Sequence, residues 1–497
     1  MKLLSIFAFA LLLLAACEPA PQQGADPSES ASTTVMASTP GTLVHLFEWT
    51  WGDIAQECEA FLGPTGYTGV QVSPPLEHAF VESLPWWDRY QPASYEINTR
   101  SGDRAAFADM VQRCDAVGVG IYVDAVINHM TGAERRESIT GRTFGAYDYP
   151  GLYGYDDFHH CGLTNSDDIE DWNDPVQVQT CELVNLADLA TGKENVRDTL
   201  AAYLSDLAGL GVAGIRIDAA RHMAPEDIAA ILDRVDGDLE VYQEVIDPAP
   251  PTWSDDYYPM GRVTEFQYSG VVSDVFKNGP LARLHGKGSI WETVPFIPGD
   301  EAFVFIDNHD NQRGHGAGGN IVMHEDGALH TLAMGFMLAY PYGQARVMSS
   351  YRFEDDAQGP PRLPDGTTKP VHDNGTLNCA QGEWVCEHRQ PEVAGMVGFR
   401  HATHDAPVAA WWTDGGDQIA FARDGRGFVA LNRSDTTLDQ TLETTLPAGT
   451  YCDVTQGGVD GAACAGRSVT VDTDGNATVQ LDAMTMLALH MEARLAE

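Results

Sequence analysis

The sequence predicts an α/β protein built on a (β/α)8 TIM barrel, with a small inserted domain and a C-terminal antiparallel β domain. Three observations support this prediction. From residue 42 onward, short apolar runs alternate with helical stretches, which is typical of a parallel sheet connected by helices. The interval 130–190 breaks this rhythm after the third apolar run. After residue 404 the pattern changes to short alternating strands, which are typical of antiparallel sheets.

Eight apolar runs are candidates for the barrel strands: 43–47, 69–72, 120–126, 212–217, 239–245, 263–266, 303–306 and 335–340. Eight parallel strands with helices between them are the number that closes a TIM barrel. We therefore expect the catalytic barrel to comprise 41–129 and 191–403, the inserted domain 130–190, and a C-terminal β-sandwich 404–497.

The N-terminus has the form of an export signal. Met1 and Lys2 precede an apolar run, 3–16, that is too short to span a bilayer comfortably. The run ends Leu-Ala-Ala-Cys at Cys17, which resembles the lipobox of bacterial lipoproteins; cleavage of an ordinary signal near Ala20 is the alternative. Residues 18–40 are rich in Pro, Ser, Thr, Ala and Gln and predict a disordered linker. We expect an exported cell-envelope lipoprotein, with 1–17 as its signal and the lipid as its only membrane contact.

Cysteine usage agrees with export. The chain has nine cysteines, and setting Cys17 aside leaves an even number, which favours disulfides in an exported protein. Sequence does not fix their connectivity, but short spacings favour Cys161 with Cys181, Cys379 with Cys386, and Cys452 with Cys464, leaving Cys58 with Cys114. Zinc binding is the alternative, although no close Cys/His pairing repeats at the usual spacing.

The chain is strongly acidic. It has 72 Asp and Glu against 29 Lys and Arg, a formal net charge of −43. Such a surface repels nucleic acid and anionic membranes, so both are excluded as electrostatic partners. It also suits saline surroundings, where salt screens the repulsion between like charges.

Two charged residues lie inside one predicted strand. In Gly-Ile-Arg-Ile-Asp, 214–218, Arg216 and Asp218 share one face because side chains alternate along a strand. Enzymes of this barrel type carry their catalytic groups at the carboxyl ends of the strands. Asp218 is therefore a candidate catalytic carboxylate; a buried Arg–Asp pair that satisfies itself is the alternative.

Two further carboxylates end predicted strands. Glu244 closes the fifth and Asp310 follows the seventh, so a closed barrel would bring both to one mouth with Asp218. Two carboxylates that flank a bond, one ionised and one protonated, are what retaining glycoside cleavage requires. Nearby aromatic residues in one loop offer flat faces for pyranose rings, with core packing as the alternative: Trp86, Trp87 and Tyr90.

Several motifs occur in an order that resembles one known family. They are His-Leu-Phe-Glu-Trp (45–49), Val-Gln-Val-Ser-Pro-Pro (70–75), Asp-Ala-Val-Ile-Asn-His (124–129), Gly-Ile-Arg-Ile-Asp-Ala (214–219) and Asn-His-Asp-Asn-Gln (308–312). With them, the chain from about 42 to about 493 resembles an alpha-amylase of the (β/α)8 glycoside hydrolase family. More narrowly, it is similar to the animal-type, chloride-dependent branch, which has bacterial members.

The resemblance implies endo-acting, retaining hydrolysis of α-1,4-glucosidic bonds in starch, glycogen and maltooligosaccharides by a monomeric enzyme. Asp218 would be the nucleophile, Glu244 the general acid and base, and Asp310 the carboxylate that holds sugar hydroxyls. Arg216 would keep Asp218 ionised while Glu244 holds its proton. The substrate-binding residues implied are Trp86, Trp87, Tyr90, Gln91, His129, Arg221, His222 and His309.

The same resemblance implies two ions. Calcium would lie between the barrel and the inserted domain, with oxygen ligands from Asn128, Gln179, Asp188 and His222, of which Gln179 and His222 would use backbone carbonyls. Chloride would be held by Arg216, Asn308 and Arg346, because two buried guanidinium groups repel unless an anion lies between them. Ion pairs with buried carboxylates are the alternative for the arginines.

Two functional alternatives stay open at the level of sequence. The first is a relative that transfers glucosyl units or trims short maltooligosaccharides, because acceptor choice depends on loops. In these loops Arg221 and Trp172 replace a Lys and a Tyr of the family. The second is a surface glucan-binding protein whose catalytic site is no longer active. The complete set of carboxylates argues against this alternative.

Overall fold

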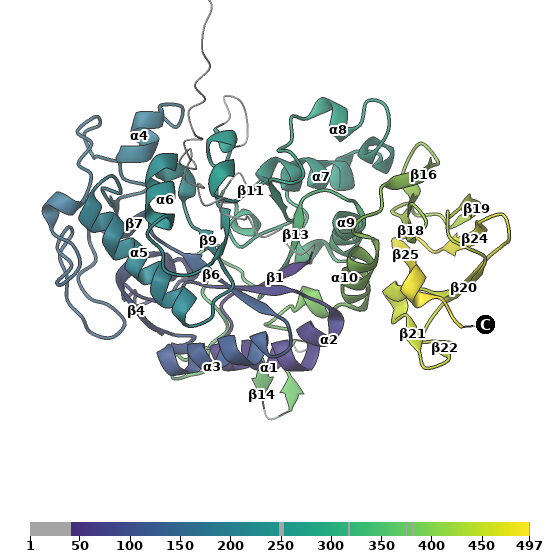
Figure 1. The fold of residues 1–497 in the computed structure, drawn as a ribbon, viewed down its shortest axis with the longest axis horizontal. Coiled ribbons are helices and arrows are strands. Elements are labelled where there is room, and N and C mark those ends of the chain that lie inside the picture. The colour runs from purple at the N-terminus through teal and green to yellow at the C-terminus, as the bar shows by residue number, and fades with distance from the viewer. Residues whose placement is uncertain (1–40, 248–252, 317–318, 374, 380–381, 497) are drawn as a thin grey trace, which may run out of the picture. The chain divides into compact units, whose positions relative to one another are not determined.

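The computed structural model describes residues 41–247, 253–316, 319–373, 375–379 and 382–496 (Figure 1). The expected signal, lipidated Cys17 and linker lie outside these residues. Within the part of the chain that is described, no helix is long and apolar enough to cross a membrane.

Eight parallel strands close into a barrel in the order β1-β13-β12-β11-β10-β9-β6-β2. Seven of them fall on the predicted runs, with ends shifted by up to a few residues. The barrel therefore confirms the predicted fold class. The strands are β1 (Leu43–Leu46), β2 (Gly69–Val72), β6 (Gly120–Ala125), β9 (Gly214–Ile217), β10 (Glu240–Gln243), β11 (Arg262–Thr264), β12 (Ala302–Val304) and β13 (Gln344–Ser349).

The predicted eighth strand is wrong. The apolar run 335–340 lies in helix α9 (Ala328–Ala339) and its end, and the eighth strand is β13. A short run that is apolar on every side has no period that separates a buried strand from a buried helix. Only three of the six residues of β13 are apolar, Ala345, Val347 and Met348, so this strand lacked the compact apolar run by which the others were found. Arg346 therefore lies within the eighth strand rather than after it.

Helices cover the outside of the barrel (Figure 1). Helix α5 illustrates the pattern, since Val196, Leu200, Leu204 and Leu207 recur at helical spacing and are buried. Helix α3 begins at an aspartate cap, where Asp103 Oδ1 accepts from the Ala106 backbone N at 2.9 Å. The principal helices are α1 (Trp51–Glu57), α3 (Arg104–Asp115), α5 (Glu194–Gly209), α6 (Pro225–Leu232), α7 (Phe266–Asn278), α8 (Ile290–Thr293), α9 and α10 (Pro391–Thr403).

The interval between β6 and β9 contains further short elements, which we call the small unit after β6. It holds an antiparallel pair, β7 (His129–Gly132) and β8 (Leu186–Asp188), and helix α4 (Pro175–Thr180). Another antiparallel sheet, β3 (Leu76–His78), β4 (Pro92–Thr99) and β5 (Gly102–Asp103), comes from the loop after β2.

The C-terminal region is an antiparallel sandwich, drawn in yellow-green and yellow in Figure 1. Apolar side chains of both sheets, including Phe428, Val479 and Leu487, form its core. One sheet is β16 (Val408–Thr413), β17 (Gln418–Arg423), β18 (Gly427–Asn432) and β25 (Thr485–His490); the other is β19 (Leu438–Glu443), β24 (Asn476–Leu481), β23 (Ser468–Val471) and β20 (Gly449–Cys452).

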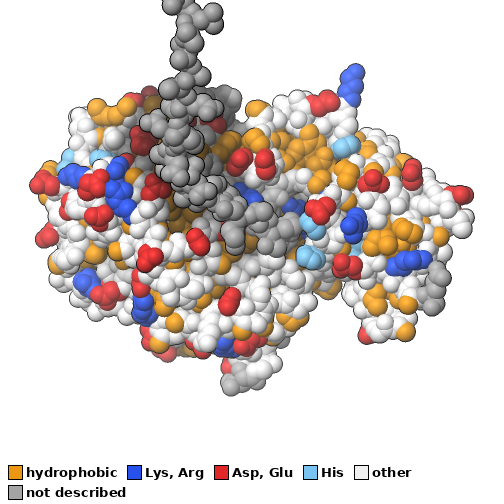
Figure 2. Space-filling view, viewed as in Figure 1, with side chains coloured by type: hydrophobic (Ala, Val, Ile, Leu, Met, Phe, Trp, Pro, Cys, Tyr) orange, Lys and Arg blue, Asp and Glu red, His pale blue; other side chains and the backbone are white. Residues whose placement is uncertain are grey.

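Four disulfides join the cysteine pairs that the spacing favoured: Cys58–Cys114, Cys161–Cys181, Cys379–Cys386 and Cys452–Cys464. The second lies within the small unit after β6, and the fourth within the sandwich. Asp and Glu side chains are scattered over the face shown in Figure 2 rather than gathered in one patch. This spread keeps like charges apart on a protein of high net negative charge.

A buried arginine of the sandwich joins it to the barrel helices. Arg423, on β17, is 1% exposed. Its Nη1 donates to the Ala339 carbonyl at 2.8 Å, and its Nη2 donates to the Thr403 carbonyl at 2.7 Å. These carbonyls end helices α9 and α10, where backbone acceptors lack intrahelical partners and the helix dipole favours a cation. Nε also donates to the Ala406 carbonyl at 2.7 Å.

We expect Arg423→Ala to lower the free energy of unfolding by about 3 kcal/mol, because it leaves several buried carbonyls without a donor. Chemical denaturation followed by circular dichroism measures the change. Arg426→Ala, an exposed position on the same hairpin, is the matched control and should be close to neutral. Equal unfolding midpoints for the two variants would contradict this role of Arg423.

Candidate active site

Four carboxylates and one arginine meet at the carboxyl ends of the barrel strands. Asp218 follows β9, Glu244 follows β10, and Asp124 lies in β6. Arg216, 2% exposed on β9, contacts all three of these acids. Its Nη1 lies 2.5 Å from Asp124 Oδ1 and 2.9 Å from Asp218 Oδ1, and its Nη2 lies 2.6 Å from Glu244 Oε1.

Asp310 reaches the same cluster from the loop after β12. Its Oδ2 lies 3.3 Å from His309 Nε2. Burial, together with the neighbouring Glu244, raises the pKa of Asp310 to about 7. Burial also raises the pKa of Asp218 well above its ordinary value, against the opposing effect of Arg216. One guanidinium thus shares its charge among several acids, and the cluster holds protons at a pH where free carboxyl groups would have lost them.

We expected Arg216 to keep Asp218 ionised while Glu244 holds its proton. In the structure Arg216 contacts both acids, so its contacts alone do not set them apart. The two acids differ instead in their backbone partner, since Glu244 Oε2 accepts from the Ala219 backbone N at 2.9 Å. Ala219 has a left-handed backbone, with φ of 49°. A non-glycine residue adopts this conformation at a cost in free energy. In this conformation the Ala219 amide points toward Glu244.

Asp124 is the site residue that the sequence analysis left without a role. The parallel register places Asp124 of β6 beside Arg216 of β9. Its Oδ2 accepts from the Tyr90 hydroxyl at 2.9 Å and from Gln71 Nε2 at 3.1 Å. A charged residue inside an otherwise apolar predicted strand was the signal that singled out Arg216, and it applies equally to Asp124.

Aromatic rings form a wall beside the carboxylates. Tyr90 stacks on His309 with ring centroids 5.3 Å apart, and Trp86 meets His309 edge-on at 5.4 Å. Trp86 and Tyr90 are each less than one-tenth exposed, so both also pack as core residues. Trp87 is only half-buried, with the guanidinium of Arg135 5.7 Å from its ring centroid. Gln91 is buried, and its Oε1 accepts from the Gly132 backbone N at 3.1 Å.

Two histidines near the cluster are neutral near pH 7. Burial lowers the pKa of both His129 and His222 to about 4. His129 Nε2 lies 2.9 Å from the Tyr90 carbonyl oxygen, and His222 Nδ1 lies 3.0 Å from that of Val178. A neutral imidazole offers both a donor and an acceptor, which suits hydrogen bonds to hydroxyl groups.

Arg221 ties three loops together on the side of Glu244. Its Nη1 donates to the Ile246 carbonyl at 2.9 Å and its Nη2 to the Trp172 carbonyl at 3.3 Å. Its Cζ lies 4.4 Å from the ring centroid of Trp253. The indole of Trp172 is 46% exposed. Arg221 thus holds the loops after β9 and β10 and the small unit after β6 in one arrangement.

The residues expected to hold calcium form two pairs of neighbours, Asn128 with Asp188 and Gln179 with His222. Leu189 N donates to the Asn128 carbonyl at 3.0 Å, next to Asp188. Helix α4, which carries Gln179, packs against the turn that carries His222. Asn128 Oδ1 is buried and has no hydrogen-bond partner among the described residues, and burial raises the pKa of Asp188 to about 7. An unpaired amide oxygen and a buried carboxylate fit a hard cation. No cluster of three or more His, Cys, Asp or Glu side chains that could hold a metal is found in the described part of the chain, and the expected set includes only one carboxylate.

The arginines expected to hold chloride differ in their surroundings. Arg216 is paired with carboxylates, whereas Arg346, also 2% exposed, forms no ion pair within the described ranges. Arg346 Nη1 donates to Gln71 Oε1, and its buried Nε has no partner there. Asn308 Oδ1 accepts from the Asp310 and Asn311 backbone N atoms and so shapes the loop between β12 and Asp310. A buried guanidinium without a counter-charge fits an anion.

Comparisons with known proteins agree with this geometry. Residues 412–492 match the family model of the alpha amylase C-terminal all-beta domain. Pancreatic alpha-amylase of Sus scrofa is 46% identical over 91% of this chain and 95% of its own length. Alpha-amylase of Pecten maximus is 43% identical over 93% of this chain and 95% of its own length.

Solved structures give the same result. Alpha-amylase I of Eisenia fetida, determined as wild type and as a mutant in complex with maltohexaose, superposes with a TM-score of 0.85 at 40% identity, covering 91% of this chain and 97% of that one. The gamma-CGTase of Bacillus clarkii shares the fold, with a TM-score of 0.64 at 18% identity over 92% of this chain and 71% of that one. The protein described here belongs to the alpha-amylase family of glycoside hydrolases.

Proposed function

We propose that this protein is an endo-acting alpha-amylase that hydrolyses α-1,4-glucosidic bonds of starch, glycogen and maltooligosaccharides with retention of configuration. The observation that carries the proposal is the carboxylate cluster around Arg216, where Asp218 and Glu244 share one guanidinium at the mouth of the barrel. Two carboxylates held this close to each other can act on opposite sides of one glycosidic bond.

In the proposed mechanism, Asp218 attacks the anomeric carbon while Glu244 donates its proton to the departing glycosidic oxygen. The bond from the anomeric carbon to that oxygen breaks, and a bond to Asp218 forms. Glu244 then removes a proton from water, which attacks the same carbon and releases Asp218. Two displacements on opposite faces retain the configuration.

The remaining residues position the sugar in this proposal. Asp310 accepts hydrogen bonds from sugar hydroxyls, and the neutral His129, His222 and His309 exchange hydrogen bonds with others. The half-buried ring of Trp87 offers an apolar face to a pyranose, and Trp86 and Tyr90 are the further aromatic residues of the same loop. Gln91 and Arg221 fix the loops at either side.

We also propose two resident ions. Asn128, Gln179, Asp188 and His222 would hold calcium, which would supply a staple between the barrel and the unit after β6. Arg346, with Arg216 and Asn308, would hold chloride, which would supply a negative charge near Glu244 and so favour its protonated form.

A further part of the proposal concerns location. The chain would be exported, carry a lipid on Cys17, and act at the cell envelope as a monomer. The four disulfides support export, because such bonds persist in oxidising compartments.

We expect Asp218→Asn and Glu244→Gln each to lower kcat on starch by at least about three orders of magnitude, since each removes a chemical role while keeping the shape of the side chain. A reducing-sugar assay measures the loss, and melting temperatures close to wild type show that the fold is kept. Near wild-type turnover in either variant would refute the assigned roles.

Removal of calcium should lower the melting temperature. A ligand that binds only the folded state stabilises it by about 2.7 kcal/mol at a hundredfold excess over its Kd. Differential scanning calorimetry with and without a chelator measures the shift. Asp188→Asn should abolish most of the response to the chelator; identical melting of the wild type in both conditions would argue against the ion.

Chloride-free buffer should reduce activity and move the basic limb of the pH profile to lower pH. The sign follows from charge: an anion near Glu244 disfavours loss of its proton, so without the anion the general acid is lost at lower pH. The profile is measured after dialysis against a bulky anion at equal ionic strength. Arg346→Gln should weaken the response, and superimposable wild-type profiles would speak for arginines that need no anion.

A further inference from the structure

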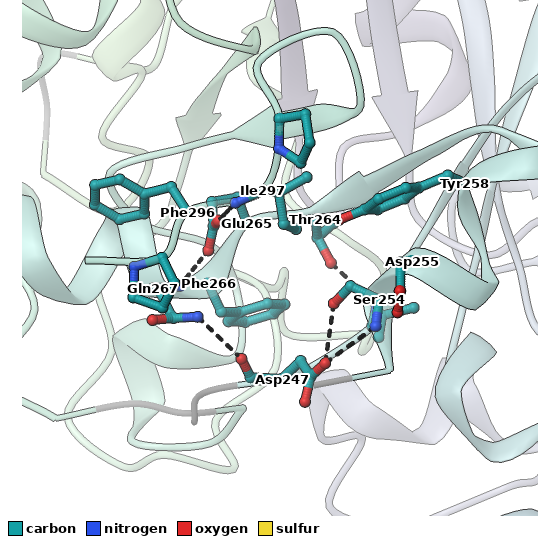
Figure 3. A pocket seen from close by; sticks show the side chains of 13 residues that line it. Asp247, Ser254, Asp255, Tyr258, Thr264, Glu265, Phe266, Gln267, Phe296 and Ile297 are labelled. Carbon is teal, nitrogen blue, oxygen red and sulfur yellow. Dashed lines mark hydrogen bonds between the residues drawn. The ribbon is translucent and has the colours of Figure 1, made fainter. Parts of the chain in front are cut away.

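The barrel mouth is built differently on its two sides. Residues that follow β10 and β11 line a cavity of about 300 Å3 (Figure 3). Strands β1 and β2 lie across the closed barrel from these two strands. On that side the loop after β2 carries Trp86, Trp87 and Tyr90 within residues 85–90, which we call the aromatic loop. A network of buried charged residues contacts the backbone of this loop.

Arg100 is the centre of this network. It directly follows β4, and its side chain is 12% exposed. Its Nε donates to Glu48 Oε2 at 2.9 Å and its Nη2 donates to Glu48 Oε1 at 3.2 Å, so this pair is bidentate. Nη1 donates to Asp88 Oδ2 at 3.0 Å, and Nη2 also donates to the carbonyls of Pro85 and Trp86 at 3.1 and 3.4 Å. One guanidinium thus joins Glu48 to three residues of the aromatic loop.

Glu48 connects the network to the barrel. It lies two residues after β1, it is fully buried, and its backbone N donates to Ser73 Oγ at 3.0 Å. Its φ of 67° lies in the left-handed region, which a non-glycine residue adopts at a cost in free energy. Burial opposes ionisation of Glu48, but Arg100 and Arg89 outweigh this effect and hold its pKa below the ordinary value. Glu48 is therefore an ionised partner with a fixed position.

The position of Arg100 requires a guanidinium group. Its N–H donors point in fixed directions within one plane, which lets it serve two carboxylates and two carbonyl oxygens at once. A lysine ammonium is a compact charge and cannot reach all of these acceptors from one place. Loss of the guanidinium would leave Asp88 and the loop carbonyls without this donor, and the aromatic loop would lose its connection to Glu48.

The aromatic loop bears directly on the active site. The Tyr90 hydroxyl donates to Asp124 Oδ2 at 2.9 Å, and the Tyr90 ring stacks on His309. Trp87 follows Trp86 in the same loop and is half-buried. A displacement of about 1 Å in a group that positions substrate can lower the rate by about a hundredfold. The contacts of Arg100 therefore matter for the geometry of the rings.

We propose that Arg100 is a positioning residue for glucan binding, which fixes the aromatic loop to Glu48 in the arrangement that stacks on sugar rings. The stacking role of the rings rests on the proposed function. Arg100 acts through Trp87 and its neighbours in the loop rather than by contact with the sugar.

Hydrogen–deuterium exchange of the ligand-free protein tests the placement of the loop. We expect Arg100→Met to accelerate exchange of the backbone amides in 85–91 by about tenfold or more, because the loop opens more often once its connection to Glu48 is lost. The Gln91 amide, which donates to the Asp88 carbonyl at 3.1 Å, is one of these amides. Mass spectrometry of the peptides that cover this segment measures the change.

Arg433→Met is the matched control. The Arg433 side chain is also 12% exposed, and its guanidinium donates to Asp417 and to the carbonyls of Val275 and Gly279, between the sandwich and α7. This variant removes a similar set of contacts away from the barrel mouth. It should lower the melting temperature but leave exchange in the aromatic loop unchanged.

Binding of maltohexaose measures the consequence for substrate. Isothermal titration uses the full-length Asp218→Asn protein, whose turnover should be too low to consume the sugar. In this background Arg100→Met should weaken binding by about tenfold, the effect of a misplaced stacking ring. Arg100→Lys should weaken it as well, and it keeps the charge beside Glu48 in case Arg100→Met does not fold. Arg433→Met should leave the affinity unchanged.

A double-mutant cycle separates positioning from a general loss of stability. If Arg100 acts through the loop, the combined variant Arg100→Met with Trp87→Ala should lose less affinity than the sum of the two single losses, because the ring on which Arg100 acts is already absent. Additive losses would overturn the proposal, and so would unchanged exchange in 85–91 in both Arg100 variants.

The outcomes distinguish this inference from the proposed function. Starch hydrolysis by the wild type, together with unaltered exchange and affinity in the Arg100 variants, would contradict the inference alone. Absence of starch hydrolysis by the wild type would contradict the proposed function, whatever the exchange of the aromatic loop shows.

Discussion

The site depends on one buried arginine. Arg216 lies within a barrel strand and contacts Asp124, Asp218 and Glu244 at once. Without it, these acids would repel one another in a low-dielectric interior and would retain their protons. With it, their negative charge is only partly balanced, and the pKa values of Asp218 and Asp310 stay above their ordinary range. Such a cluster can hold one carboxyl group protonated, as the general acid requires, and another ionised, as the nucleophile requires.

Arg346 is in the opposite situation, that of a buried cation without a carboxylate partner among the described residues. It is as deeply buried as Arg216 but has an amide oxygen rather than a carboxylate as its partner. The barrel interior thus contains one arginine, Arg346, that lacks a carboxylate, and a cluster of acids that share a single arginine, Arg216. His45 and His309 are neutral, because burial and the two arginines lower their pKa values well below the ordinary range.

Much of this arrangement could be predicted from the sequence. Seven barrel strands were found because each is a compact apolar run, and Asp218, Glu244 and Asp310 because strand ends in a barrel share one mouth. The eighth strand was missed because only three of its six residues are apolar, while α9 is apolar enough to resemble a buried strand. The contacts of Arg216 with both Asp218 and Glu244 depend on rotamers and on the register between strands, which no sequence period encodes.

Helix α9 has a consequence for how the chain reaches its folded form. Most of its residues are buried, and it packs between the barrel and strands β18 and β25 of the sandwich. Gly335 in this helix leaves room for Met486 of β25, because a Cβ there would lie 2.4 Å from the Met486 sulfur. β25 comes far downstream of α9, after all the other strands of the sandwich. A polypeptide that emerges N-terminus first therefore leaves the surface of α9 that meets β25 uncovered until this strand arrives, so the contact between the barrel and the sandwich is completed only after β25 has been made.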